Sequence, residues 1–400
     1  MDEFSLRYRG WRVVLACFLM AVFGWGLGFY GHSVYLAELT RLHGWPAALI
    51  SSASTLYYLV SASLVVFVSD AVQRLGPRTV ALAGIAAFAL SAAGVGLATE
   101  PVHVFAAYLL MSAGWAALTL AAITNILGMW FHQRRGLAIS LALNGASTGG
   151  IVGVPALVWL IDACGFQRAM LIAAAAILII LLPIVLLWID RPHAEARAAN
   201  PPSASPPPAS DPALTRSRAV RSPHFWTIAA PFAFGLMAQV GFIVHQIAFL
   251  EPSIGRRGAG LAVAVTTVMA VVGRVGMGFL IDRLDQRRVT AVSLASQALA
   301  LLIMMQTAEP MLLYGACALF GFSVGNLITL PALIIQREYE AAAFGMLTAL
   351  VVAINQVAYS FGPGLLGILR DATGSYAAPL GVCMALEIAG AIVVLLRVRR

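Results

Sequence analysis

The chain has 400 residues, of which 60% are hydrophobic and 10% are charged. Ordinary soluble domains are about 45–50% apolar and about 25% charged. This composition excludes an ordinary soluble domain and indicates a membrane protein. The formal net charge of +8 comes from arginine, because all 25 basic residues are arginines and the sequence contains no lysine.

Apolar runs recur along the chain that are long enough to cross a bilayer core of about 30 Å, which takes about 20 helical residues. They predict twelve spans, at residues 11–36, 46–69, 77–98, 101–128, 136–161, 168–189, 224–250, 257–281, 289–308, 310–335, 342–369 and 376–396. We therefore expect an all-α, multi-pass protein embedded in a lipid bilayer. No small-residue cleavage site follows the first run, so we expect that helix to be retained.

The arginines are distributed unevenly between the predicted loops. With the N-terminus inside, 19 lie in cytoplasmic segments, one lies in a span, and five lie outside, at Arg41, Arg168, Arg256, Arg257 and Arg370. This bias follows the positive-inside rule, so the charge reflects topology and predicts no nucleic-acid partner. Both termini are then cytoplasmic. The lack of lysine, with abundant alanine and arginine, indicates a bacterial source and hence a cell inner membrane.

A segment rich in proline interrupts the spans at residues 190–222. It holds seven prolines and five arginines and cannot form a packed core, so it predicts a flexible cytoplasmic linker. Residues 1–189 and 223–400 then form two halves with six spans each.

The two halves are related by a shift of 209 residues. The shift places residues 162–165 (Asp-Ala-Cys-Gly) on residues 371–374 (Asp-Ala-Thr-Gly). The other pairs at this offset are Gly153 with Gly362, Gly136 with Gly345, Arg78 with Arg287, and Gln73 with Asp282. Two related six-helix halves joined by a long inner loop are the build of a secondary transporter, whose site lies between repeats near mid-membrane.

The sequence shows no motif for metal binding, disulfide formation or catalysis. The four cysteines, Cys17, Cys164, Cys317 and Cys383, are scattered singly without metal or disulfide spacing. No span presents paired carboxylates or a nucleophile with a base. We expect no cofactor, no metal and no enzyme activity.

The loop after the eighth span, residues 278–288, reads Gly-Phe-Leu-Ile-Asp-Arg-Leu-Asp-Gln-Arg-Arg. It resembles the inter-helix signature of the major facilitator superfamily, and the resemblance extends over essentially the whole chain. The first-half copy is degenerate: Ser69 and Gln73 replace the expected glycine and aspartate, whereas Gly76 and Arg78 match. An aspartate with arginines at a helix end can hold neighbouring helices together and release them. The candidate latch residues are Asp282, Arg283, Arg287, Arg288, Gly76 and Arg78. The alternative is an ordinary basic loop.

Residues 130–145, from Trp130 to Gly145, resemble the signature that leads into the fifth helix of monocarboxylate transporters. Arg9-Gly10-Trp11 resembles the start of their first helix, although the usual upstream acid is missing. The motif indicates a family and not a substrate. Small residues at Gly145, Gly149, Gly150 and Gly153 would let the fifth helix approach a neighbour closely.

Arg274 lies deep in the apolar eighth span. Placing arginine at the centre of a span costs about 2.5–3.5 kcal/mol, so such residues face water and mark a pathway. A guanidinium can also grip a carboxylate with two parallel hydrogen bonds. We interpret Arg274 as the anchor for an anionic substrate, and the family resemblance implies the same role. The alternative is a structural pair with Glu387, the one acid inside the last span.

The first helix carries Tyr30 and His32 in a glycine-rich stretch. By resemblance, His32 replaces a lysine that animal carriers use in proton coupling, and histidine changes charge near neutral pH. The alternative is a hydrogen-bonded packing histidine. Tyr30 resembles a substrate-lining tyrosine of the bacterial oxalate carrier. The two residues are about 200° apart on a regular helix, so both can face one cavity only if the helix is distorted.

Further candidates lie in the second half. His245 in the seventh span is a proton-relay or substrate-contact candidate, with a structural role as the alternative. Asn355 stands where the oxalate carrier has a second cation, and one cation suits one carboxylate. Tyr359 shares the face of Asn355. The weaker pore-lining candidates, each also able to hold helices together, are Asn326, Tyr58 and Asn125.

The sequence thus predicts a carrier of small monocarboxylates, lactate- or pyruvate-like, which couples transport to protons by alternating access. Ala270 stands where animal carriers have an aspartate beside the helix-eight arginine, which leaves their coupling scheme incomplete here. The alternatives are an oxalate/formate-like anion exchanger, an organic-acid exporter, and a transporter-like receptor that binds an acid without moving it.

Overall fold

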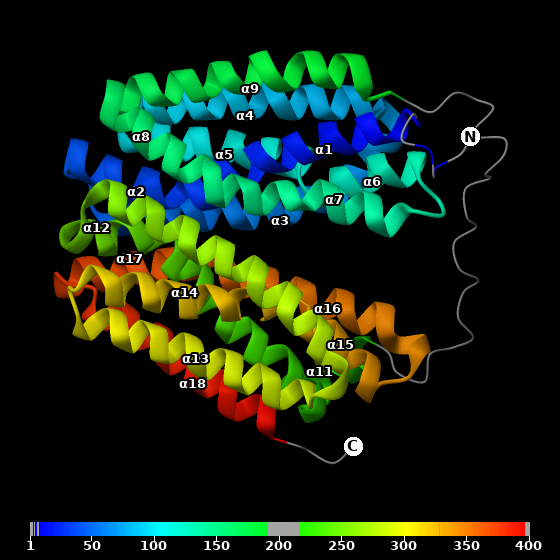
Figure 1. Cartoon of the computed structure of the whole chain (residues 1–400), viewed down its shortest axis with the longest axis vertical. Coiled ribbons are helices and arrows are strands. Elements are labelled where there is room, and N and C mark those ends of the chain that lie inside the picture. Colours follow the sequence, from blue (N-terminus) through cyan, green and yellow to red (C-terminus); the bar gives the residue numbers. More distant parts are fainter. Residues whose placement is uncertain (1–2, 4, 6–7, 191–215, 328, 397–400) are drawn as a thin grey trace. The chain divides into compact units, whose positions relative to one another are not determined.

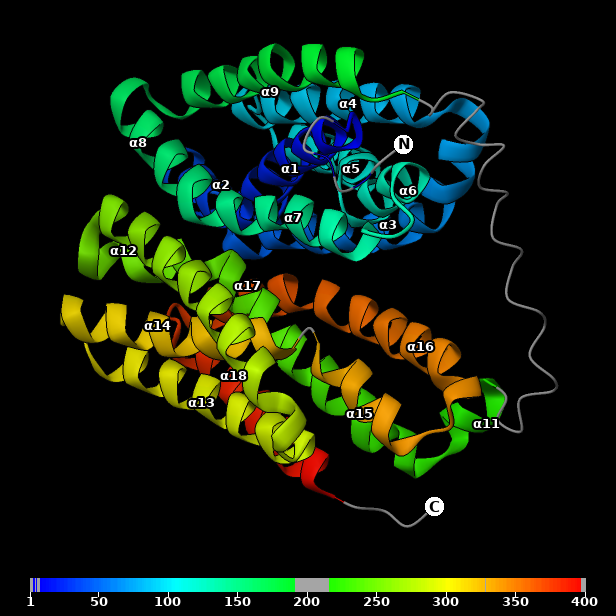
Figure 2. The same cartoon turned by 45° about the vertical axis from the view of Figure 1, so that its right-hand side comes forward.

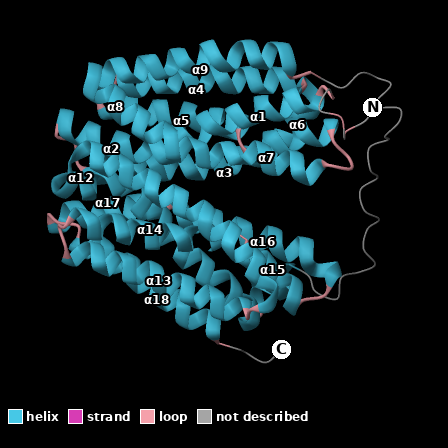
Figure 3. Ribbon diagram, viewed as in Figure 1, coloured by secondary structure: helices cyan, strands magenta, loops and turns pink. Residues whose placement is uncertain are grey.

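The computed structural model describes residues 3, 5, 8–190, 216–327 and 329–396, and for residues 278–280, 282, 341 and 342 it describes the backbone alone. These residues form helices joined by short loops, and no strand occurs among them (Figure 3). Most of the expected linker, residues 191–215, lies outside the described residues. Its last part forms a short helix, α11 (Arg216–Arg221).

The chain divides into two compact units of contacting residues. Unit 1 consists of Met1–Trp45 and Leu56–Ala204, and unit 2 of Pro46–Thr55 and Ser205–Arg400. Apart from the short segment at the start of the second span, these units follow the two repeated halves. The chain is a membrane protein of two pseudo-symmetric six-helix halves.

The spans of the first half are interrupted by the π-helical turns η1 and η2 and by an extended residue, Thr119, between α5 and α6. Figure 1 shows the arrangement of the helices. Prolines stand in the first turn of several helices of this half, where the missing N–H has no helical partner to lose. The elements are α1 (Gly10–Trp25), η1 (Gly26–Tyr30), α2 (Gly31–His43), α3 (Ala47–Leu75), α4 (Pro77–Gly96), α5 (Pro101–Leu118), α6 (Leu120–Trp130), α7 (Arg135–Thr148), η2 (Gly149–Gly153), α8 (Val154–Cys164) and α9 (Phe166–Trp188).

The second half begins with α12 (Pro223–Leu280), which is 58 residues long. A continuous helix of that length would extend about 87 Å, almost three times the bilayer core. The backbone reverses at Gly255, where φ is +71°, so α12 contains the seventh and eighth spans. With α12 counted twice, the apolar helices among the described residues number twelve, as predicted.

The remaining elements of the second half are shown in Figure 2. They are η3 (Ile281–Arg283), α13 (Gln286–Gln306), α14 (Pro310–Leu327), α15 (Leu330–Glu338), α16 (Ala341–Ser360), α17 (Gly362–Thr373) and α18 (Ala377–Leu395). Helices α14 and α15 form the tenth span, and α16 and α17 the eleventh.

Glycines let helices of the first half touch backbone to backbone. A methyl group on Gly149 would lie 2.5 Å from the backbone oxygen of Val22 and 2.7 Å from the nitrogen of Gly26. Gly145, one turn earlier, meets the backbone oxygen of Phe18 in the same way. The expected close approach of the fifth helix to a neighbour is thus confirmed, and the neighbour is the first helix.

The second half repeats this device between its own helices. Gly362 on α17 packs against the backbone at Gly241 on α12, and Gly362 is the residue that the 209-residue shift pairs with Gly153. Along the eighth and tenth spans, Gly273 meets the backbone of Phe322, and Gly325 meets that of Ala270. These contacts exclude any side chain larger than hydrogen.

The repeated Asp-Ala-x-Gly segments both end helices at a glycine with positive φ, although ψ is 160° at Gly165 and 2° at Gly374. Gly165 follows α8 with φ +83°, and Gly374 follows α17 with φ +71°, which is the left-handed region where glycine costs least. In unit 2 the carboxylate of Asp371 also accepts a hydrogen bond of 2.7 Å from the backbone nitrogen of Ala48. This contact satisfies one of the free amides in the first turn of α3.

The glycine contact between the first and fifth helices can be tested with a matched pair of alanine variants. Both Gly149→Ala and Gly136→Ala gain helix propensity of about 1 kcal/mol. Only Gly149 has backbone atoms within 3.0 Å of the added methyl group, whereas Gly136 has nothing within 4 Å. We expect Gly149→Ala to be destabilised by about 1–3 kcal/mol relative to Gly136→Ala. Thermal unfolding in detergent measures the difference, and equal midpoints would contradict the packing argument.

Candidate functional site

Arg274 lies in the part of α12 after Gly255, which is the eighth span. It follows Gly273, whose backbone contacts α14. Its side chain is exposed, and no hydrogen bond or ion pair is found for it among the described side chains. The guanidinium is therefore available to an incoming anion. The alternative pair with Glu387 is not formed, because Glu387 is fully buried within α18 and has no described partner.

His32 lies at the start of α2, with its side chain fully buried. Its ring is surrounded by four tyrosine rings, with centroids 4.6 Å away for Tyr57, 4.8 Å for Tyr108, 5.5 Å for Tyr58 and 6.0 Å for Tyr35. Neither ring nitrogen has a hydrogen-bond partner among the described residues. His32 is thus not the hydrogen-bonded packing histidine of the alternative interpretation.

The glycine-rich stretch before His32 is distorted, as a shared cavity would require. Residues 26–30 form a single π-helical turn, η1, and such turns are frequent at functional sites. A second π turn, η2, packs against it through Gly149 and Gly26. Tyr30 is nevertheless half-buried and His32 fully buried, so the two side chains lie in different environments.

His245 on α12 is fully buried and engaged at both ring nitrogens. Its Nε2 lies 3.1 Å from the backbone oxygen of Pro363, and its Nδ1 lies 3.1 Å from the hydroxyl of Tyr376. A carbonyl oxygen can only accept, so Nε2 donates, and in the neutral ring Nδ1 accepts from the tyrosine. The neutral imidazole is thus fully satisfied, and it ties α12 to the eleventh and twelfth spans.

The amide candidates are buried and incompletely bonded. Asn326 donates from Nδ2 to the oxygen of Phe322 at 3.3 Å, and its Oδ1 has no partner in the described part of the chain. Asn355 is 6% exposed, and its Oδ1 is likewise without one there. Each amide therefore retains an acceptor for another hydrogen bond.

The other two tyrosine candidates, Tyr359 and Tyr58, differ from Asn125 in their surroundings. Tyr359 is only partly buried, whereas Tyr58 is 2% exposed within the cluster around His32. Asn125 accepts from the hydroxyl of Ser69 at 3.2 Å, so it links α6 to α3.

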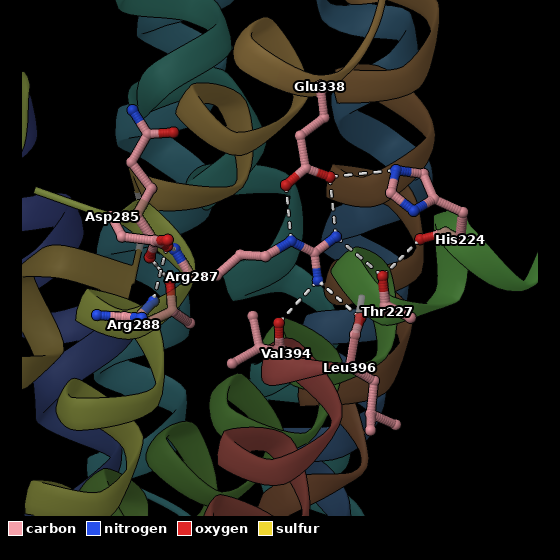
Figure 4. Close-up of polar contacts among 10 residues, drawn as sticks. His224, Thr227, Asp285, Arg287, Arg288, Glu338, Val394 and Leu396 are labelled. Carbon is pink, nitrogen blue, oxygen red and sulfur yellow. Dashed lines mark hydrogen bonds and ion pairs between the residues drawn. The ribbon is translucent and has the colours of Figure 1, made fainter. Parts of the chain in front are cut away.

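Arg287 lies in the first turn of α13, just after the loop that follows α12, and its side chain is 4% exposed. Its Nε and Nη2 bind the two carboxylate oxygens of Glu338 at 2.7 and 2.9 Å. Its Nη1 donates to the oxygens of Val394 and Leu396 at 2.7 and 3.3 Å, and its Nη2 to the hydroxyl of Thr227 at 3.0 Å. Figure 4 shows the guanidinium at the centre of these contacts. One side chain thus joins α12, α13, α15 and α18.

Two neighbouring groups complete this network. The Nε2 atom of His224, on the first turn of α12, lies 3.1 Å from Oε2 of Glu338. Asp285 caps α13, because its carboxylate accepts from the backbone nitrogens of Arg287 and Arg288 at 3.0 and 3.2 Å. The cap orients the first turn of α13 and so directs Arg287 inward.

Arg78, the counterpart of Arg287 in the repeat, makes a similar but weaker contact. Its Nε donates to the oxygen of Ile189 at 2.8 Å, and its Nη2 lies 3.2 Å from Oδ2 of Asp190. In both halves, then, the arginine at the start of the third helix binds the carbonyl end of the sixth helix, where the helix dipole favours positive charge. The first-half pair is exposed, 40% for Arg78 and 62% for Asp190.

The other latch candidates take no comparable part. Gly76 begins α4 with φ +92°, and Arg283 and Arg288 have exposed side chains. The side chain of Asp282 lies outside the described residues. Sequence reasoning missed Glu338 and His224. The available signal was an acid, Glu338, in the polar stretch that ends the tenth span. No group of three or more His, Cys, Asp or Glu side chains that could hold a metal occurs in the described segments.

Known proteins are similar to this chain over nearly its whole length. The family model described as Major Facilitator Superfamily matches residues 14–259 and 241–400. The chain belongs to the major facilitator superfamily. The fold of this superfamily member is similar to the crystal structure of the nucleoside transporter NupG, with a TM-score of 0.73 at 13% identity, covering 96% of this chain and 97% of that one.

Relatives of this superfamily member include Monocarboxylate transporter 13 of Rattus norvegicus, 27% identical over 399 residues, 95% of this chain and 87% of the relative. Monocarboxylate transporter 11 of Mus musculus is 28% identical over 337 residues, 80% of this chain and 72% of the relative. The similarity to both extends across the two halves.

The bidentate contact of Arg287 can be tested with Glu338→Gln, which keeps the size of the side chain and removes its charge. Breaking a fully buried pair costs about 3–5 kcal/mol, and Glu338 is 25% exposed, so we expect a loss of about 2 kcal/mol. Arg288→Ala, on the next and exposed position, should change stability by no more than about 0.5 kcal/mol. Thermal unfolding of both variants in detergent measures this difference, and equal effects would contradict the assignment.

Proposed function

We propose that this transporter carries small monocarboxylates, lactate- or pyruvate-like, together with protons, and that it works by alternating access. Its arginine distribution supports an inner-membrane location with both termini in the cytoplasm. The monocarboxylate transporters among its relatives support the substrate class. The observation that carries the proposal is Arg274, an exposed guanidinium in an apolar helix with no partner among the described side chains.

Arg274 supplies the binding energy for a carboxylate. An unpaired arginine at membrane depth is costly, and a bound carboxylate neutralises it through two charge-assisted hydrogen bonds. Asn355 is the residue at the position of a possible second cation, and an amide adds a hydrogen bond without a charge. This pair suits an anion with one carboxylate. Tyr30, Tyr58, Asn326 and Tyr359 are the further contacts that we propose for the substrate.

Proton coupling requires a side chain that gains and loses a proton during the cycle. His32 and His245 are the histidines that we propose for this role. They differ in geometry, because His245 is fully hydrogen-bonded as a neutral ring, whereas His32 lacks a described hydrogen-bond partner. Protonation of His245 would make its Nδ1 a donor and disrupt the bond that this atom accepts from Tyr376, whereas protonation of His32 disrupts no described hydrogen bond.

We propose that the residues around Arg287, and not Asp282, form the conformational latch of the second half. The network among Arg287, Glu338 and the end of α18 holds the inner ends of four helices of the second half together. Its separation would let those ends move as the transporter changes state. Arg78 performs the equivalent contact in the first half with an exposed and so weaker ion pair.

Arg274→Lys tests the substrate anchor, because lysine keeps the charge and loses the two-pronged geometry. Losing one charge-assisted hydrogen bond costs about 1.5–3 kcal/mol, so uptake of radiolabelled lactate or pyruvate into proteoliposomes should fall at least about tenfold. Arg168→Lys, at an exposed position in the first turn of α9, is the matched control and should retain uptake. Full transport by folded Arg274→Lys protein would overturn the anchor assignment.

Proton symport and anion exchange are distinguished by the driving force. An electroneutral symporter converts one pH unit into an about tenfold concentration ratio, because each corresponds to about 1.4 kcal/mol. We expect vesicles with an alkaline lumen to accumulate monocarboxylate to about this extent. Rapid counterflow that does not respond to the pH gradient would instead show an exchanger.

A further inference from the structure

Glu387 is a carboxyl group in the interior of the second half that none of the contacts above uses. It occupies the middle of α18, which extends from Ala377 to Leu395, and its side chain is 0% exposed. Neither carboxyl oxygen has a hydrogen-bond partner in the described part of the chain. Buried polar groups almost always have partners, so this exception requires an explanation.

The immediate surroundings of Glu387 are apolar. Its Oε2 lies 3.7 Å from the position that a methyl group on Gly235 of α12 would take, and Leu294 and Leu327 reach the same glycine. One turn away on α18, the thiol of Cys383 is directed to the backbone oxygen of Ala238 at 3.6 Å. Gly235 leaves room for the carboxyl group, and none of these neighbours carries a charge.

Helices α13 and α18 lie side by side and run in opposite directions (Figures 1 and 2). Arg287 at the start of α13 binds the oxygen of Val394 at the end of α18. Further along, a methyl group on Gly390 would lie 3.1 Å from Leu294. One more turn in the same direction along each helix brings Gln297 to the level of Glu387.

Gln297, like Glu387, is fully buried without a described hydrogen-bond partner. Its side chain is 0% exposed, and both Oε1 and Nε2 are without a hydrogen-bond partner among the residues described. Gln239 on α12, one turn after Gly235, has an Nε2 in the same state. Three neighbouring helices of the second half therefore each carry a buried polar side chain with unused hydrogen-bonding capacity.

The charged and titratable groups on the helices around these side chains are engaged elsewhere. On α13, Arg287 binds Glu338 at the helix start, and the side chain of Arg288 is exposed there. On α12, His224 contacts Glu338 and His245 contacts Tyr376, at opposite ends of the seventh span. None of these side chains forms an ion pair with Glu387 in the described structure.

Charges on other parts of these elements also form no described ion pair with Glu387. On α12, Glu251 and Arg256 pair with each other at 3.5 Å near the reversal at Gly255. On α17, Arg370 and Asp371 pair with each other at 3.3 Å. The exposed Arg274 in the eighth span forms no ion pair with it either. An ionised Glu387 would therefore be a buried charge without compensation, which costs several kcal/mol.

A proton removes that charge at the least cost. The carboxylate accepts H⁺ at one oxygen to give a neutral acid, and the reverse step returns H⁺. The acid also gains an O–H donor, for which Oε1 of Gln297 is an available acceptor on the facing helix. A metal ion fits less well, because hard cations take six to eight oxygen ligands.

We propose that Glu387, with Gln297 at its level on α13, forms a proton-binding site inside the second half, and that this site acts together with the histidines proposed above in carrying the proton of the transport cycle. The binding of a proton rests on the structure alone, whereas its use in transport rests on the proposed function.

The first experiment tests protonation and needs no substrate. Infrared spectra of the full chain in lipid vesicles at neutral pH should show the C=O stretching band of a protonated carboxyl group. Glu387→Gln should remove that band, and the matched control Glu309→Gln, at an exposed position before α14, should leave it unchanged. A band that Glu387→Gln does not remove, or its absence from the wild-type spectrum, would overturn the proposal.

A second variant keeps the proposal testable if Glu387→Gln does not fold. Gln297→Leu leaves the acid in place and removes its hydrogen-bond acceptor, so it should shift the frequency of the band without abolishing it. An unchanged frequency would exclude Gln297 from the site.

The second experiment tests coupling and compares pH-gradient-driven uptake of lactate with counterflow in the same vesicles. We expect the ratio of the two in Glu387→Gln to fall to the value measured without a gradient, while Glu309→Gln keeps the wild-type ratio. A wild-type ratio in Glu387→Gln would overturn the coupling role even if the infrared band is lost. If the wild-type protein moves no monocarboxylate at all, the proposed function fails, and the infrared result still decides the site.

Discussion

Backbone contact at glycines is the constraint on which the packing within each half depends. Inside a bilayer, helices gain no hydrophobic free energy by associating, so they rely on close van der Waals contact and hydrogen bonds. Gly149 brings the fifth helix onto the first, Gly362 brings the eleventh onto the seventh, and Gly325 brings the tenth onto the eighth. Each contact also determines which helix faces are left to carry polar side chains.

Charged side chains are divided between helix ends and helix interiors, and the division follows their electrostatic cost. At the ends, Arg287 and Arg78 bind carbonyl oxygens that would otherwise have no partner, so their charge is compensated. In the interiors, Arg274 and Glu387 have no described counter-charge. Uncompensated groups at membrane depth usually mark functional positions, and the roles that we propose for the two are complementary: Arg274 binds an anion and Glu387 a proton.

The fold could be predicted from the sequence nearly in full, whereas the candidate site could be predicted only in part. Twelve apolar runs and the 209-residue repeat are local or periodic features, and a span must satisfy its own backbone hydrogen bonds. The contacts of Arg287 were different, because its partner Glu338 is 51 residues away and has no counterpart at the repeat offset. The aspartate nearer in sequence, Asp285, caps a helix instead.

The sequence by itself determined the class of protein, its two halves, and the identity of Arg274 as a cation in an apolar span, because each depends on composition and spacing. Only the tertiary structure decided which polar groups meet. It surrounds His32 with tyrosines from three spans, satisfies both nitrogens of His245, and leaves Glu387 and Gln297 buried without described partners. The partners of a buried polar side chain depend on which helix packs against its own and at what height. That packing joins helices that are far apart in the chain, so the sequence alone does not give it.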